Sequence, residues 1–455
     1  MRKVLLASAG VLLAAGAAAN AQPVKPAAPG TIAVHVNGYF QFGLDDVGST
    51  YNTYTTGGST SKLNPVTTNG EFRLYPGFDA TTIGGISYGA QVQLNTTFSD
   101  ANKGAGSNTT STGTGTGSLY VRRAYGYLGT PDDGYVRFGQ TDGAFTLLQT
   151  GVIEAFGDGS QFTSQDSASQ YVVPSKARPG QFIYADQGSL YATDKVVLIS
   201  PSLAEPYLGG QFSAMASYEP NGNGLKEGYA TCAVAGPTCA SLSSTGTFNS
   251  TLATERQNTF DVAGQYALKA FGFNSKASVG FLDGNPIRYT GSTAGANAAY
   301  NLDKLQVTQV GLQTTHNDLF LGGDAITLGA NVKWGQTLDA YAPKPKGGRD
   351  ALAYIVGGNY VIGPYVIGAS FFDSQTAGNY YAGKKGEART LSEYGAAVGG
   401  NYVIGKDLSL YAQYLYGHSH QPGNGFAGAG TGVGATPAKS NTQMQLVSVG
   451  GTFKW

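Results

Sequence analysis

The sequence has little charge and no long apolar run, and each shortage excludes a class of protein. Only 12% of its 455 residues are Asp, Glu, Lys or Arg, about half of the roughly 25% usual in globular proteins. Beyond the N-terminal segment, no run reaches the roughly 18 apolar residues that a membrane-spanning helix requires. Basic and acidic residues number 28 each, so no basic excess indicates nucleic-acid binding. The composition argues against a helical membrane protein and against a nucleic-acid-binding protein.

Residues for catalysis are also scarce. The chain shows neither a Ser-His-acid arrangement nor a G-x-S-x-G motif, and the glycine-rich tract GAGTGVG lacks the lysine of a phosphate-binding loop. His418 and His420 would share one strand face and could bind a metal, but two polar residues at a strand-loop boundary explain them as well. The other two histidines, His35 and His316, are far from them in sequence. We therefore expect no enzyme, no metal and no cofactor.

Glycine and aromatic residues are abundant instead. There are 68 Gly, 29 Tyr and 21 Phe, and Gly alone is about twice its usual share of roughly 7%. Apolar and polar residues alternate in short segments, most cleanly at 260–268 and 408–416. Such alternation is typical of an outer-membrane barrel, because lipid-facing and water-facing residues alternate along each strand. The pattern predicts an all-β protein, a transmembrane antiparallel β-barrel; a secreted β-sandwich or β-helix is the alternative.

The N-terminus has the organisation of a secretory leader. Arg2 and Lys3 are its positive end, residues 4–16 its apolar middle, and Ala19-Asn20-Ala21 an A-x-A cleavage site. We predict a signal peptide at 1–21 and a single exported barrel at 22–455.

Short turns and long loops alternate between the predicted strands. Turns such as AFG, HND and IGKD are followed by loops of over a dozen residues, as in barrels with short periplasmic turns and long external loops. Counting in this way gives about 16 strands, with both termini on the short-turn side. The segment around Tyr184 must then belong to a loop. Between Leu305 and Leu312 the alternation is irregular, and faces can be assigned there only with a bulge.

Two further features of the sequence fit this scheme. The octapeptide VGGNYVIG occurs at 356–363 and again at 398–405, which places Tyr360 and Tyr402 at the same depth near the short-turn side, where an aromatic girdle would lie. Cys232 and Cys239 lie in one predicted external loop of an exported chain. We expect them to form a disulfide, because the compartment is oxidising.

The stretch from Ser118 to Leu198 organises the rest of the chain. It begins with a hairpin whose polar face carries Arg122 and Arg137, whereas strand alternation predicts that Arg123 points the other way. Residues 142–193 follow, a connection too long for an ordinary loop in a compact domain. We expect this constriction loop to fold into the barrel lumen and to narrow it. An arginine on the lipid face costs about 2 to 4 kcal/mol near the midplane, so the strand arginines should face water.

The sequence resembles the general porins of Gram-negative bacteria, of the alphaproteobacterial kind. The similar segments are the leader, RLYPGFDA, RRAYGYLG with GYVRFGQTDG, VVLISPSLAEPYLGGQFSAMASYEP, and the final TFKW. The resemblance implies a barrel of sixteen strands that assembles as a homotrimer in outer-membrane lipid and carries an inward-folded third loop. It implies a passive diffusion channel for small hydrophilic solutes and ions.

The resemblance also implies roles for individual residues. Basic residues on the wall would face acidic residues on the loop across a narrow gap, and the terminal aromatic strand would be recognised by the outer-membrane assembly machinery. The pore constriction would consist of Arg73, Arg122, Arg137, Glu154 and Asp158, and the assembly signal of Phe453 and Trp455. A solute-selective porin for sugars or anions, a surface adhesin or scaffold, and a barrel enzyme are the alternatives.

Overall fold

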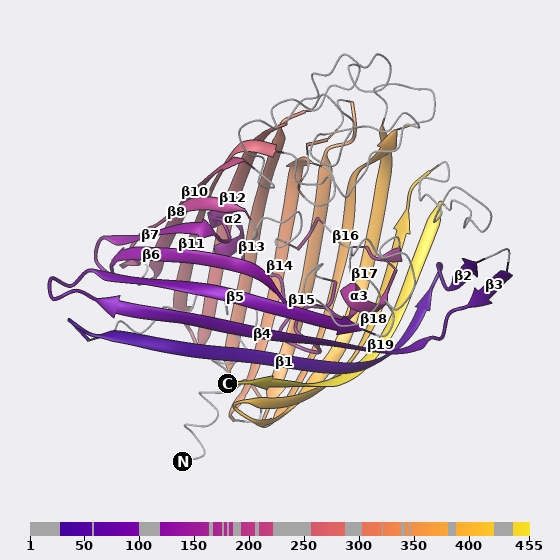
Figure 1. Ribbon diagram of the computed structural model, residues 1–455, viewed down its shortest axis with the longest axis horizontal. Coiled ribbons are helices and arrows are strands. Elements are labelled where there is room, and N and C mark those ends of the chain that lie inside the picture. The colour runs from indigo at the N-terminus through magenta and orange to yellow at the C-terminus, as the bar shows by residue number, and fades with distance from the viewer. Residues whose placement is uncertain are drawn as a thin grey trace.

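A closed antiparallel β-sheet forms the body of the protein in the computed structural model (Figure 1). The structure describes residues 28–56, 59–99, 119–162, 167–174, 177–179, 182–184, 193–204, 209–221, 256–286, 303–320, 322–337, 341, 343–344, 347–380, 388–422 and 440–455. The predicted signal peptide and the predicted disulfide between Cys232 and Cys239 lie outside these residues. Among the described residues, no helix is long and apolar enough to cross a membrane.

Within the described ranges, sixteen strands make the barrel, as the alternation of turns and loops predicts. They are β1 (Ile32–Ser49), β4 (Val66–Thr81), β5 (Ser87–Ser99), β6 (Tyr120–Thr130), β7 (Gly134–Gln140), β8 (Asp194–Ile199), β10 (Gln211–Asn221), β11 (Arg256–Ala270), β12 (Phe273–Pro286), β13 (Leu305–Asn317), β14 (Asp324–Gln336), β15 (Ala351–Ile362), β16 (Tyr365–Tyr380), β17 (Ala388–Gly405), β18 (Leu408–His420) and β19 (Asn441–Lys454).

The smaller elements lie in the connections between these strands. The two-residue strand β9 (Leu203–Ala204) extends the edge of β8 along β10. A short hairpin of β2 (Thr53–Thr56) and β3 (Ser59–Lys62) lies in the connection between β1 and β4. The helices α2 (Ala144–Leu147) and α3 (Ala168–Val172) belong to the predicted constriction loop. Tyr184 also lies in this connection rather than in a spanning strand, as the strand count requires.

The barrel closes where the first and last strands meet, since β1 pairs with both β4 and β19. The terminal Trp455 extends this seam. Its N–H donates to the carbonyl of Gly38 at 3.2 Å, and the Gly38 N–H donates to the Trp455 carbonyl at 3.0 Å. Its indole packs against the ring of Phe72, with 5.8 Å between ring centroids. A Cβ on Gly38 would overlap the indole ring, so the absence of a side chain there lets the last residue lie flat on the seam.

The outer face of the barrel is apolar, as period-two alternation predicts. On β12, Val279 and Phe281 are 54% and 38% exposed, whereas the intervening Gly280 and the following Leu282 face inward and are buried. Tyr360 and Tyr402 lie close to the short turns that follow β15 and β17. The outward apolar residues form a continuous belt that suits contact with lipid. Other members of the belt are Phe42, Leu44, Leu128, Phe138, Leu198, Phe260, Val310, Leu312, Leu328, Trp334, Val356, Phe371, Val398, Leu410, Val447 and Val449.

Part of the inner face is apolar as well, and this explains the irregular pattern after Leu305. The pairing of β13 with β12 and with β14 runs without a register shift, so the expected bulge is absent and that prediction is wrong. Leu305 and Val307 simply point inward, where both are fully buried, while Val310 and Leu312 point outward. A hydrophobic core inside the barrel covers these inward residues. The alternation looked irregular because both faces of this strand are apolar.

Candidate pore constriction

The connection between β7 and β8 begins at a buried ion pair. Arg123 on β6 donates from Nε and Nη2 to the two carboxylate oxygens of Asp142, at 2.8 and 3.1 Å, and from Nη1 to Gln93 at 2.8 Å. The prediction that Arg123 points outward is therefore wrong. The register of β5 against β6 shifts between Gln93 and Leu94, which leaves Arg122 as an extra residue. Such a bulge resets the alternation of the strand, and both arginines are buried.

Opposing effects act on the Asp142 carboxyl. Burial alone would raise its pKa, but the charge and hydrogen bonds of Arg123, together with the charges of Arg122 and Lys195, hold the pKa of Asp142 below its usual value. Asp142, the second residue after β7, is thus tied to the wall as a charged pair.

The end of the same connection is held by a second buried cluster. The Thr193 hydroxyl donates to Glu219 on β10 at 2.6 Å. The same carboxylate pairs with Lys195 at 3.0 Å and with Arg256 at 3.2 Å. Burial of all three charged side chains makes the cluster sensitive to the loss of any member, since a remaining charge would be left uncompensated. Both ends of the connection are therefore fixed by charge.

Between these ends, amide side chains on the inner wall bind the main chain of the connection. Phe145, Thr150, Ala155 and Gly157 each offer a carbonyl oxygen, and Asp158 offers its N–H. The wall partners come from five strands between β13 and β18: Gln309 on β13 donates to the Phe145 carbonyl, Asn331 on β14 to Thr150 at 2.8 Å, Asn359 on β15 to Ala155 at 3.4 Å and Asn401 on β17 to Gly157 at 2.7 Å, and Gln413 on β18 accepts from Asp158 at 3.1 Å. This amide track holds the connection along the wall.

The repeated octapeptide supplies two members of the amide track. Asn359 and Asn401 occupy the same position within the two copies of VGGNYVIG. Each points inward to a loop carbonyl, while the following tyrosine, Tyr360 or Tyr402, belongs to the opposite face of its strand. Sequence reasoning used the repeat only to place the tyrosines. The repeated asparagine was the signal that could have located the loop anchors.

Glycines on the wall allow the loop to lie close to it. A Cβ on Gly311 would lie 2.0 Å from the Thr150 carbonyl oxygen, and a Cβ on Gly368 would overlap the ring of Phe156. Apolar loop residues complete the contact, as where Phe162 packs edge-on against Phe372 of β16 at 5.1 Å. The connection thus has its own hydrophobic core with the barrel wall. Helix α2 contacts β10, β11 and β12, and α3 contacts β1, β4 and β5, so the connection follows the inner wall most of the way round (Figure 1).

The carboxylate of Asp158, one of the acids expected at the constriction, binds main-chain N–H groups of the loop. One carboxylate oxygen accepts the N–H groups of Ser160 and Gln161 at 3.0 and 3.1 Å, and the other accepts the N–H of Ala168 at 2.9 Å. Burial raises the pKa of Asp158 in spite of these three hydrogen bonds. The carboxylate therefore shapes the loop around α3.

Replacing Asp158 by asparagine should loosen this part of the loop. Because both oxygens accept main-chain N–H groups, an amide must turn its own NH₂ toward one of these donors, and we expect a loss of about 1 to 3 kcal/mol in the free energy of unfolding. Thermal unfolding in detergent would measure this loss, with Asp132→Asn in an exposed turn as the control. Equal midpoints for the two variants would contradict the assignment.

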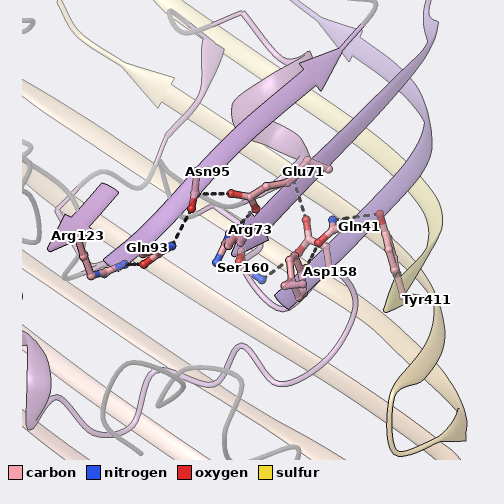
Figure 2. A network of polar contacts seen from close by, with 11 residues as sticks. Gln41, Glu71, Arg73, Gln93, Asn95, Arg123, Asp158, Ser160 and Tyr411 are labelled. Atoms are coloured by element: carbon pink, nitrogen blue, oxygen red, sulfur yellow. Dashed lines mark hydrogen bonds and ion pairs between the residues drawn. The ribbon is translucent and has the colours of Figure 1, made fainter. Parts of the chain in front are cut away.

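Arg73 lies on β4 and belongs to a chain of polar contacts that reaches Arg123 on β6 (Figure 2). Its guanidinium pairs with Glu71 on the same strand and lies 5.0 Å from the centre of the Tyr39 ring. The chain continues from Glu71 through Asn95, at 2.8 Å, and Gln93, at 3.1 Å, to Arg123. Arg73 and the Arg123 ion pair are thus parts of one hydrogen-bonded wall.

Asp158 faces this wall from the loop (Figure 2). Its charge acts on the hydroxyls of Tyr39 and Tyr411, and Gln41 donates to the Tyr411 hydroxyl at 3.3 Å. Since the Arg73 guanidinium covers the Tyr39 ring, the structure brings Arg73 and Asp158 into one region of the lumen.

Arg137 lies on β7, three strands along the sheet from Arg73 on β4, and Glu154 lies on the loop. Arg137 points inward from β7, where its guanidinium lies 4.6 Å from the centre of the Tyr125 ring and donates weakly to the Thr141 hydroxyl at 3.4 Å. Its neighbour on the strand, Phe138, faces outward. Glu154 is partly exposed, and its carbonyl accepts from the Gln161 side chain at 3.1 Å. Arg122, at the bulge, is near enough to lower the pKa of Asp142. The described residues contain no cluster of three or more metal-ligating side chains.

A closed antiparallel barrel with an apolar outer belt and a long connection fastened inside it belongs to the class of transmembrane β-barrels. A sequence profile of Gram-negative porins matches residues 7–421. The chain therefore belongs to the Gram-negative porin family and is a protein of the bacterial outer membrane.

Other comparisons concern curated sequences and solved structures. No curated protein matches the sequence. The outer-membrane protein OmpT of Vibrio cholerae has a TM-score of 0.45 at 12% identity, over 95% of this chain and 100% of that one. A trimer form of OmpT has a TM-score of 0.43 at 14% identity, over 93% and 100%. A triple mutant of the Rhodopseudomonas blastica porin has a TM-score of 0.44 at 13% identity, over 93% and 100%.

Proposed function

We propose that this porin is a passive diffusion channel for small hydrophilic solutes and ions, narrowed by the connection at 142–193. The observation that carries the proposal is the fastening of this connection inside the barrel, by ion pairs at both ends and by the amide track between them. A segment fixed along the inner wall in this way would reduce the cross-section of the lumen, and solutes would pass through the space that it leaves open. A surface adhesin would have no need of an internal segment fixed so thoroughly.

The charges at the narrowing would act as a filter. Inward residues of β4, β6 and β7 such as Arg73, Tyr125 and Arg137 are only partly buried, in contrast to the fully buried inward residues of β13 and β15. Fixed charges beside a narrow aqueous path select ions by sign. We propose Arg73, Arg122 and Arg137 as the basic side of the constriction and Glu154 and Asp158 as its acidic side. Arg73, Arg137 and Glu154 are partly exposed, whereas Arg122 and Asp158 are buried and would act on ions through their fields rather than by contact.

Removing a basic or an acidic charge from the constriction should shift the ion preference of the channel, in opposite directions for the two signs. We expect Arg137→Ser to make the channel more cation-preferring and Glu154→Gln to make it more anion-preferring, because each removes a fixed charge from the path. Both shifts should shrink in 1 M salt, where screening shortens to about 3 Å. Reversal potentials in planar bilayers across a salt gradient measure the effect, with Lys406→Ser, an exposed residue of a short turn, as the control. A wild-type protein without stepwise conductance would refute the proposal.

Assembly is a further part of the proposal. We infer a homotrimer in outer-membrane lipid, and recognition of Phe453 and Trp455 by the assembly machinery. The position of Trp455 on the closing seam, paired with Gly38, supports a role of the terminal residue in the last step of barrel closure.

A further inference from the structure

A second connection enters the barrel at Tyr341. This residue lies between β14 and β15, yet its side chain is fully buried. Its backbone has a φ of +56°, a left-handed conformation that is uncommon for residues other than glycine and is disfavoured for bulky side chains. Surrounding contacts must maintain such a conformation, and an observed outlier of this kind is a reason to look for a function.

The Tyr341 ring lies between two separate parts of the constriction loop. It packs edge-on against Phe145 in α2, with 5.9 Å between ring centroids, and at a tilt against Phe182 near the other end of the loop, with 5.5 Å between centroids. Edge and tilted contacts of this kind stabilise aromatic pairs beyond the burial of their area. Tyr341 therefore bridges the first and last parts of the loop.

The Tyr341 hydroxyl joins the same groups by hydrogen bonds. It donates to the Phe182 carbonyl at 2.9 Å and accepts from the Lys333 ammonium at 2.8 Å. Lys333 projects from β14, is fully buried, and lies 5.7 Å from the centre of the Phe145 ring, within range of a cation–π interaction. One hydroxyl thus links the barrel wall, through Lys333, to the main chain of the constriction loop.

We propose that Tyr341 is a positioning residue that holds the constriction loop and so sets the size limit of the pore. The proposal rests on the proposed function, because a size limit requires a conducting channel. Space filling alone would need an aromatic ring but no hydroxyl, so the hydroxyl separates a positioning role from simple packing.

The test combines three variants with recordings of single channels in planar bilayers. Tyr341→Phe keeps the ring and removes the link between Lys333 and the Phe182 carbonyl, whereas Lys333→Met removes only the wall partner. Lys333→Met should raise the frequency of a wider conductance state about fivefold, as expected for the loss of one typical hydrogen bond, and Tyr341→Phe, which loses both hydrogen bonds of the hydroxyl, roughly thirtyfold. The double variant should resemble Tyr341→Phe alone, because the same hydroxyl is affected in both cases. Tyr341→Ala should raise the frequency by two orders of magnitude or more and admit larger sugars in liposome-swelling assays.

The matched control is Tyr218→Phe, which removes the tyrosine hydrogen bond to Asn258 at 2.9 Å on an exposed outward side chain. It should leave conductance and size limit unchanged. Tyr341→Phe behaving like Tyr218→Phe, or Tyr341→Ala keeping the wild-type size limit, would overturn the inference while the proposed function stands. If Tyr341→Ala does not assemble, Tyr341→Phe and Lys333→Met decide. A wild-type protein that does not conduct would overturn the proposed function and this inference together.

Discussion

Valine in place of Gly311 should lift the constriction loop from the wall and widen the channel. A Cβ at this position of β13 would lie 2.0 Å from the Thr150 carbonyl oxygen and 2.8 Å from the Asn331 side chain. Neither the strand nor the loop main chain can yield without breaking the hydrogen bond between Asn331 and Thr150. Overpacking of this severity costs about 3 kcal/mol or more, and release of the loop is the simplest relief.

Single-channel conductance measures the result for Gly311→Val, and we expect it to rise while the barrel still resists heating in detergent. Gly48→Val on β1 is the matched control, because the nearest atom to its added Cβ is 3.6 Å away. A normal conductance in Gly311→Val would mean that the loop does not narrow the pore at Thr150.

Removing the positive partner of Asp142 should release the beginning of the loop. Arg123→Met leaves a buried carboxylate without its bidentate partner, a change that typically costs about 3 to 5 kcal/mol. Replacing both residues, Arg123→Met with Asp142→Leu, should recover most of the lost stability, because no buried charge then remains unpaired. The midpoint of thermal unfolding and the noise of single channels are the two measurements.

The response to pH should reverse in sign between wild type and this variant. In the wild type the pKa of Asp142 is lowered from its ordinary 3.8, so the pair stabilises the loop above that pH and is lost as the pH falls through the lowered pKa. Without Arg123, burial outweighs the weaker effects of Arg122 and Lys195, and the pKa of Asp142 should rise. In acid, the single-channel current noise of Arg123→Met should then decrease, whereas that of the wild type should increase. Parallel pH responses would show that Arg123 is not the group that controls Asp142.

The sequence predicted the barrel because its signals are local. Alternation at Phe260 and Val262 records which face meets lipid, and the lengths of turns and loops record the number of strands. The resemblance to porins likewise depended on short motifs, each of which is a continuous stretch of the sequence. Arg137 was placed correctly on the inward face, because no irregularity separates it from Phe138, which faces outward.

Alternation failed where the pairing of strands, rather than the strand itself, decides direction. At Arg122 the register against β5 shifts by one residue, and this brings Arg123 inward to Asp142. The alternation around Leu305 and Val307 looked irregular for another reason, because a hydrophobic core inside the barrel makes inward apolar residues favourable. The sequence indicated Asp158 by its charge, and only the tertiary structure shows that its carboxylate accepts main-chain N–H groups of the loop.

The sequence by itself determined the fold class, the strand number and the outer surface, since these depend on the period of a strand and on the lipid that surrounds it. Only the tertiary structure decided how the inside is arranged. The anchoring of the loop by Asn331 and Asn401, and the insertion of Tyr341 between Phe145 and Phe182, join residues far apart in the chain. Such contacts leave no periodic trace, because their energy depends on distances that exist only after the barrel has closed.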